Sequence, residues 1–152
     1  MKSLLNASDR DEILRRLSAI GATSQGRWGK MTAAEMVCHL DDALRVSMGE
    51  KYARPIGNWV SRTVVKWCAL WVPTHWPHGF PTVAACDARR EGTKPSAMED
   101  DLRGLRESFE RFTRRPREYA LQAHPIFGAM NEWEWMRWGY LHIDHHLRQF
   151  GA

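Results

Sequence analysis

The sequence lacks the signals typical of secreted and membrane-spanning proteins. Its three cysteines are odd in number and form no Cys-x-x-Cys pair, which favours reduced thiols over a disulfide framework. The N-terminus has no apolar segment long enough for a signal peptide. The most apolar run, Trp59 to Val72, has 14 residues and is interrupted by Arg62 and Lys66, so it is too short to cross a bilayer. We therefore expect a cytoplasmic protein without a membrane span.

Strand patterns are missing as well. No segment alternates apolar and polar residues with a period of two, and the chain has neither an internal repeat nor a low-complexity tract. Glycine and proline are too few to suggest disorder. A chain of 152 residues is long enough for one core of ordinary size. We expect a single all-α domain over residues 1–152.

The formal net charge of +4 allows nucleic-acid binding but is weak evidence for it. Arginines are spread along the chain, with short clusters at Arg89-Arg90 and at residues 114–117. This spread fits solvated helix faces and loops better than a nucleic-acid interface, so we do not expect a nucleic-acid partner.

Four main helices are predicted from N-terminal capping signals followed by apolar residues at helical spacing. Each signal is a capping residue followed by an acidic residue at the third helical position. The four pairs are Ser8 with Asp11, Thr32 with Glu35, Ser96 with Glu99, and Asn131 with Glu134. Gly21, Gly49 and Pro116 can end the first three helices.

An additional helical stretch is expected after Asn58, with an apolar stripe formed by Val60, Val64, Trp67 and Trp71. A long loop follows, from Pro73 to Pro95. Long loops in compact domains are usually functional or cover a site. These elements fit a four-helix bundle whose crossover between the second and third main helices carries the extra helical stretch.

Three histidines could meet inside such a bundle. His142 and His146 are four residues apart, which places them on one helix face with Cβ atoms roughly 5–6 Å apart. His39 lies beside the apolar stripe of the second main helix. Three imidazoles suit Zn²⁺, and also Ni²⁺ or Fe²⁺, and leave a position for water or substrate. The spacing alone fits hydrogen-bonded core histidines better than a metal site.

Two segments of the chain resemble the DinB-like superfamily. They are residues 31–45, Met-Thr-Ala-Ala-Glu-Met-Val-Cys-His-Leu-Asp-Asp-Ala-Leu-Arg, and residues 140–151, Tyr-Leu-His-Ile-Asp-His-His-Leu-Arg-Gln-Phe-Gly. Together with His-Pro-Ile-Phe-Gly at 124–128, they are similar to an uncharacterised bacterial subgroup. The resemblance implies a four-helix bundle, often a homodimer, that binds a divalent metal through His39, His142 and His146.

The resemblance also implies a choice between two functions. The wider superfamily includes transferases and an isomerase that use low-molecular-weight thiols, so a metal-dependent transferase or hydrolase acting on a small molecule is one hypothesis. A non-catalytic stress-related or ligand-binding module with a structural metal is the other.

Further polar residues are weaker candidates for a role at this site. Glu35 and His124 are candidate catalytic residues. Glu35 could accept a hydrogen bond from a ligand histidine or act as a general base, although it more simply completes a capping box. His124, His75 and His78 lie on loops that could cover the site, and His124 is the favoured one. Asp42 either orients His39 or is solvated. His145 points about 100° away from its neighbour His146 and is expected to hydrogen-bond a neighbouring helix or loop.

Overall fold

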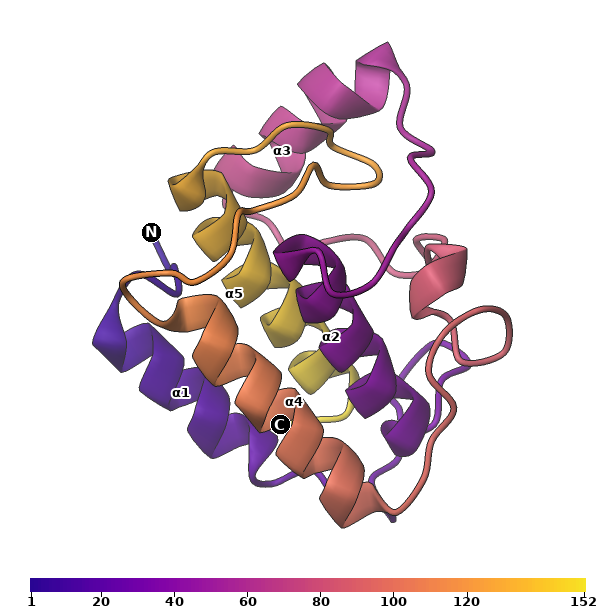
Figure 1. The fold of residues 1–152 in the computed structure, drawn as a ribbon. Coiled ribbons are helices and arrows are strands. Elements are labelled where there is room, and N and C mark those ends of the chain that lie inside the picture. Colours follow the sequence, from indigo (N-terminus) through magenta and orange to yellow (C-terminus); the bar gives the residue numbers. More distant parts are fainter.

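The computed structural model describes residues 1–152 and contains helices but no strands. The main helices are α1 (Ala7–Leu17), α2 (Ala33–Met48), α4 (Met98–Thr113) and α5 (Glu132–Gln149). They pack as a bundle, and the long crossover from α2 to α4 leaves the bundle and returns (Figure 1). The crossover carries a π-helical turn η1 (Ser61–Val65), the short helix α3 (Lys66–Trp71) and a 3₁₀ turn η2 (Ala84–Cys86). The predicted four-helix bundle with a helical crossover is confirmed.

The helices that carry the three histidines begin where the capping signals predicted. In α2, the Thr32 side chain accepts from the Glu35 backbone N–H, and the Glu35 carboxylate accepts from the Thr32 N–H. Asn131 and Glu134 form the same reciprocal pair at the start of α5. Each pair satisfies two backbone donors that the first helical turn cannot satisfy itself. Gly49, at φ 80°, ends α2 in the left-handed conformation.

The predicted start and end of α1 are wrong. The helix begins at Ala7 rather than after Ser8, and it ends at Leu17, well before Gly21. Its first turn is anchored by Asp9, which is buried and accepts hydrogen bonds from the Ser3 N–H and the Asn6 side-chain amide, both at 2.9 Å. The two hydrogen bonds to the Asp9 carboxylate stabilise this start of the helix more than a cap by Ser8 would stabilise the later one.

The predicted capping box of α4 is also wrong. The residue that precedes the helix is Ala97, and no side chain caps it. Ser96 instead donates its hydroxyl to Asp101 at 2.7 Å, and its N–H donates to the same carboxylate at 2.9 Å. The start of α4 is therefore fixed by a carboxylate within its first turns rather than by Ser96.

The apolar stripe predicted for the crossover does not face the core. Its four residues and the preceding Trp59 are all exposed, by 46% to 74%; the four are Val60, Val64, Trp67 and Trp71. The face that turns inward carries Leu70, which is fully buried, and the partly buried Val65 and Ala69. The prediction assumed 3.6 residues per turn, whereas the π-helical turn at residues 61–65 shifts the positions that follow it.

The core lies between α1, α2, α4 and α5, and Leu4, which precedes α1, packs into it. Its largest fully buried side chains include Trp135, Phe109, Phe112 and Leu4. At Gly139 the helix α5 comes so close to its neighbours that an added Cβ would lie 2.8 Å from Leu4 Cδ1 and 3.0 Å from Phe112 Cε1. Glycine at this mid-helix position therefore lets α5 pack closely against Leu4 and Phe112. No helix in the protein is both long enough and apolar enough to span a membrane.

Candidate metal centre

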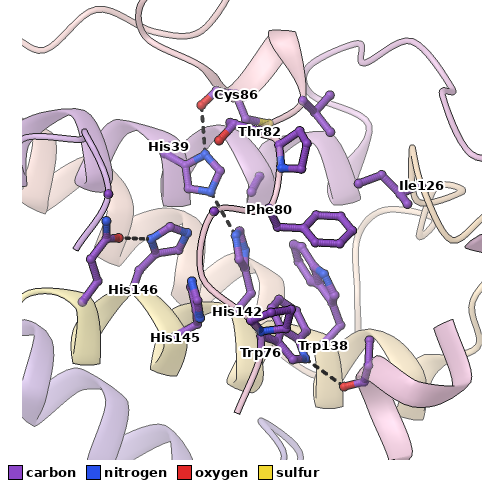
Figure 2. Close-up of a pocket in the computed structure, with 18 of the residues that line it drawn as sticks. His39, Trp76, Phe80, Thr82, Cys86, Ile126, Trp138, His142, His145 and His146 are labelled. Carbon is purple, nitrogen blue, oxygen red and sulfur yellow. Dashed lines mark hydrogen bonds between the residues drawn. The ribbon is translucent and has the colours of Figure 1, made fainter. Parts of the chain in front are cut away.

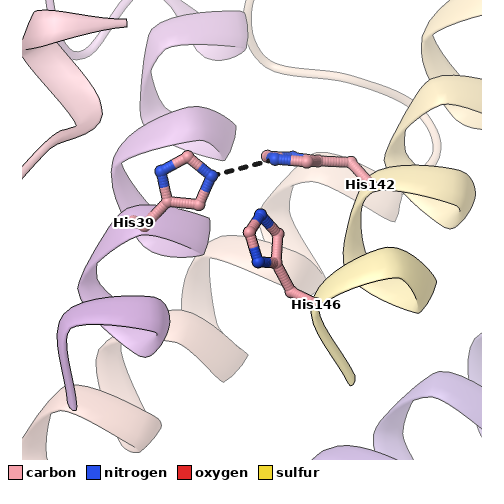
Figure 3. A group of neighbouring side chains, drawn as sticks. All are labelled: His39, His142 and His146. Carbon is pink, nitrogen blue, oxygen red and sulfur yellow. Dashed lines mark hydrogen bonds between the residues drawn. The ribbon is translucent and has the colours of Figure 1, made fainter. Parts of the chain in front are cut away.

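Three imidazoles from two facing helices meet at the centre of the bundle. His39 comes from α2, and His142 and His146 come from successive turns of α5 (Figure 3). One ligand atom from each residue lies within 4.8 Å of those of the other two. The structure therefore brings together the three residues that the sequence singled out, and the group could hold a metal ion.

His39 is held from behind in one tautomer. Its Nδ1 lies 2.9 Å from the carbonyl oxygen of Cys86, at the end of the 3₁₀ turn η2. Because a carbonyl can only accept, Nδ1 carries the proton and the Nε2 lone pair points toward His142. The crossover thus orients a side chain of α2, which is a contact that no local sequence pattern shows.

His146 is oriented in the same manner by a neighbour on its own helix. Its Nδ1 lies 2.8 Å from Oε1 of Gln149, and the Gln149 amide donates to the Trp28 carbonyl at 2.8 Å. That second bond fixes which end of the amide is the acceptor. The Nε2 of His146 is therefore left as an unprotonated ligand atom.

His142 completes the group. Its Nε2 lies 2.9 Å from Nε2 of His39, so in the metal-free protein its proton bridges the two nitrogens. Zn–N bonds of 2.0–2.1 Å in a tetrahedral site place ligand nitrogens about 3.3 Å apart. Binding a metal ion would then need this pair to open by only about 0.4 Å, relative to the same tetrahedral geometry. The three imidazoles are close enough to share a divalent ion, and His39 and His146 also have the tautomer that leaves Nε2 free to bind it.

Burial favours the neutral form of all three rings. It is the largest cause that lowers the pKa of His39, His142 and His146 below the ordinary value of 6.5. For His142 and His146, the positive charge that His39 would carry acts in the same direction. Neutral imidazoles are the form that a metal ion requires.

A cavity of about 850 Å³ opens beside the three histidines. Aromatic and aliphatic residues from the crossover, α5 and the loop before α5 form most of its wall, including Trp76, Phe80, Ile126 and Trp138 (Figure 2). The ring of Trp138 packs 4.7 Å from that of His142. Small-molecule sites in proteins typically have such a volume and such apolar walls.

His145 lines the cavity but does not make the hydrogen bond predicted for it. Its Nδ1 is buried and has no partner. The ring lies among Trp28, Trp76 and His78, with centroids 6.0 to 6.3 Å away. These neighbours present aromatic rings rather than carbonyl or carboxylate oxygens, which is why the expected bond is missing. His145 is not one of the three residues that could hold a metal ion.

Glu35 reaches the cavity wall with both carboxylate oxygens occupied. Beyond its capping role, it accepts hydrogen bonds from Arg89 Nε at 2.8 Å and Nη2 at 3.0 Å. The Arg89 guanidinium is the main cause that lowers the pKa of Glu35. A carboxylate that is paired in this way is a poor proton acceptor at neutral pH.

Asp42 neither orients His39 nor faces solvent. It is 1% exposed and accepts hydrogen bonds from the Thr93 N–H and hydroxyl, both at 2.7 Å, while Lys51 Nζ lies 2.6 Å away. Both alternatives for this residue are therefore wrong, because Asp42 ties the end of the crossover to α2.

The loop histidines lie near the site in different ways. His75 and His124 line the cavity, whereas His78 stacks on Trp28 with ring centroids 4.0 Å apart. Only His124 is buried, at 8% exposure. Its Nδ1 accepts the backbone N–H groups of Ile126 and Phe127, both at 3.1 Å.

Sequence reasoning missed the groups that orient the ligands. Gln149 follows His146 by three residues on the same helix face, a spacing that predicts contact. The Cys86 carbonyl and Trp28 have no such signal, because both are brought to the site only by tertiary folding.

The fold and the site define an all-α bundle with a three-histidine group that could hold a metal ion between α2 and α5. The chain belongs to the family described as a protein of unknown function, DUF1569, whose family model matches residues 2–152. This family is part of the DinB-like clan, which supports the resemblance seen in the sequence. No curated protein and no solved structure matches the chain.

Proposed function

We propose that this protein binds one divalent metal ion, Zn²⁺ in preference to Ni²⁺ or Fe²⁺, through His39, His142 and His146. We further propose that it is a metal-dependent transferase or hydrolase acting on a small molecule in the adjoining cavity. The observation that carries the proposal is the fixed tautomer of His39 and His146, which aims two Nε2 lone pairs at a point shared with His142.

A divalent ion with three histidine ligands lowers the pKa of a coordinated thiol or water and supplies a nucleophile at neutral pH. The residues of the chain have separate tasks around it. Gln149 and the Cys86 carbonyl hold the imidazoles in place, and the apolar wall excludes water from the substrate. Of the two candidate catalytic residues, Glu35 is paired with Arg89, whereas the Nε2–H of His124 is free to donate a hydrogen bond to a ligand.

Elemental analysis of the purified protein tests the metal site. We expect equimolar metal in the wild-type protein and loss of that metal in His39→Ala and His146→Ala. His75→Ala is the matched control, because His75 lies on the exposed crossover and is expected to leave the metal content unchanged. Full metal content in His146→Ala would contradict the proposed ligand set.

Thiol-transfer assays on a panel of electrophiles, together with hydrolysis assays, test the reaction. Activity is expected to require both the metal and an intact His39. Turnover that is unchanged in His39→Ala would rule out the metal mechanism.

The second candidate function is a non-catalytic module in which the metal is structural. The observation that favours it is that the three ligands link two different helices, α2 and α5. In this case metal loss in His142→Ala would lower the melting temperature, while no substrate of the panel would be turned over by the wild-type protein.

The homodimer and the cytoplasmic location implied by the sequence stay predictions. Light scattering of the purified protein measures the oligomeric state directly, and a monomer at micromolar concentration would contradict the homodimer.

A further inference from the structure

His124 has a fixed protonation pattern. Because its Nδ1 accepts two backbone N–H groups, Nδ1 is unprotonated and the neutral ring carries its proton on Nε2. That Nε2–H makes no hydrogen bond within the protein, although the residue is 8% exposed and lines the cavity. Burial supports the neutral form, because it lowers the pKa of His124 to about 3.

The ring cannot easily turn to satisfy its free donor elsewhere. It stacks on Phe127 with centroids 4.6 Å apart and meets the edge of Trp138 at 5.1 Å. The loop that carries it is closed by reciprocal backbone hydrogen bonds of 2.8 Å between His124 and Gly128. The Ile56 N–H donates to the Pro125 carbonyl at 2.9 Å, which ties the loop to the crossover. His124 is therefore a pre-oriented donor.

Charge is scarce in the rest of the cavity. Its charged lining residues are Lys30, Glu35, Asp87 and Arg89, and none of them is buried. Glu35 and Arg89 neutralise each other as an ion pair. Among the side chains of the protein, a charged ligand near His124 would find no buried partner of opposite charge to replace its hydration. The apolar walls and the single free donor suit an uncharged ligand.

We propose that His124 is the specificity-determining residue of this cavity: its Nε2–H selects uncharged, largely apolar ligands that carry one carbonyl-type hydrogen-bond acceptor. Selection of a ligand by this donor requires only the cavity and not a metal ion. Selection of the substrate by His124 rests on the proposed function. The acceptor group of the substrate would then be held in the cavity that adjoins the three histidines.

The test compares acetophenone with α-methylstyrene, which replaces the carbonyl oxygen by a CH₂ group of similar shape. Dissociation constants are measured by quenching of tryptophan fluorescence in the as-isolated and the chelator-treated protein. We expect the wild-type protein to prefer the ketone, because α-methylstyrene would bury the Nε2–H of His124 without an acceptor, which is costly. In His124→Asn, this preference for the ketone, expressed as the ratio of the two dissociation constants, is expected to fall about tenfold.

Asparagine suits this test because its Oδ1 can accept the two loop N–H groups in place of Nδ1, while its amide NH₂ ends near the position of the histidine Cδ2 and does not reach that of Nε2. His78→Asn makes the same change at an exposed histidine that does not line the cavity and is expected to leave the ratio unchanged. An unchanged ratio in His124→Asn, or the absence of ketone binding in the wild-type protein, would overturn the inference.

Nitrogen-15 NMR of the wild-type protein gives a measurement that needs no variant. We expect the His124 Nε2–H resonance to shift when acetophenone is added and to stay in place with α-methylstyrene. The preference for the ketone is also measured without metal, so the two proposals can fail separately. A protein that holds no metal but still prefers the ketone would support the role of His124 and contradict the proposed function. A protein that holds metal but does not prefer the ketone would contradict the role of His124 and leave the proposed function standing.

Discussion

The tautomers of two ligand imidazoles are set by hydrogen bonds that are independent of a metal ion. His39 donates from Nδ1 to the Cys86 carbonyl, and His146 donates from Nδ1 to Gln149. Such partners orient a ligand and raise its basicity. The two hydrogen bonds differ in origin, since one comes from the backbone of the crossover and the other from a side chain on α5.

Gln149→Leu should weaken metal binding without removing a ligand. The variant leaves the Nδ1–H of His146 without an acceptor and loses the bond to the Trp28 carbonyl. We expect the metal affinity to fall about 10- to 100-fold, as is usual for the loss of such a partner. Competition with a chromogenic chelator measures the change. Gln122→Leu, at an exposed position, is the control, and an affinity equal to wild type in Gln149→Leu would refute the role.

The metal-free protein should lose stability on acidification, partly through His124. Its pKa is about 3 in the folded protein and 6.5 ordinarily, so between these values the unfolded chain takes up a proton that the folded chain refuses. The free energy of unfolding therefore falls as pH falls from about 6.5, by at most about 1.4 kcal/mol per pH unit for this group. Burial is the cause of the shift, and a positive charge on His124 would also lower the pKa of His142 on α5.

Urea unfolding between pH 7 and 4 measures this dependence. His142 and the other buried histidines contribute in both proteins, so the comparison of wild type with His124→Asn isolates one proton. The variant is expected to show the shallower slope, and identical slopes would contradict the assignment.

Among the elements, α5 carries two residues of the site and also comes close to neighbouring side chains at Gly139. One face carries His142 and His146, and the helix also contains Gly139, which contacts Leu4 and Phe112. Of α5, the sequence predicted the cap and the shared face of His142 and His146. It failed at α1, α4 and α3, where a buried carboxylate, a side chain within the helix or a π-helical turn changed the outcome.

Gly139→Ala should destabilise the protein although alanine is the better helix former. The new Cβ would lie 2.8 Å from Leu4 and 3.0 Å from Phe112, and overpacking of a core costs about 1–3 kcal/mol. This exceeds the gain of about 1 kcal/mol in helix propensity. Gly104→Ala in α4 is the matched control, because nothing lies within 4 Å of its added Cβ, and it should stabilise by up to about 1 kcal/mol. Denaturant unfolding measures the stability of both variants. A Gly139→Ala protein more stable than wild type would contradict the prediction, because Leu4 and Phe112 would then move aside without loss of packing energy.

For the whole molecule, a metal ion held by His39, His142 and His146 would link α2 to α5. A ligand at a hundredfold excess over its dissociation constant stabilises the folded state by about 2.7 kcal/mol. In a domain of this size, this corresponds to a rise in melting temperature of about 5–10 °C. Chelation should therefore lower the melting temperature of the wild-type protein by that amount. In His146→Ala, chelation should change nothing, and an equal shift there would mean that the ion binds elsewhere.

The sequence by itself determined the elements with strong local causes. Reciprocal caps fix the starts of α2 and α5, helical periodicity fixes the bundle, and the four-residue spacing of His142 and His146 puts both on one helix face. The tertiary structure decided what lies around them. The Cys86 carbonyl behind His39, the inward face of α3 and the place of His124 in the cavity wall depend on segments far apart in the chain. Short-range patterns encode a helix and its face, whereas a hydrogen bond across the bundle is encoded only in how the whole core packs.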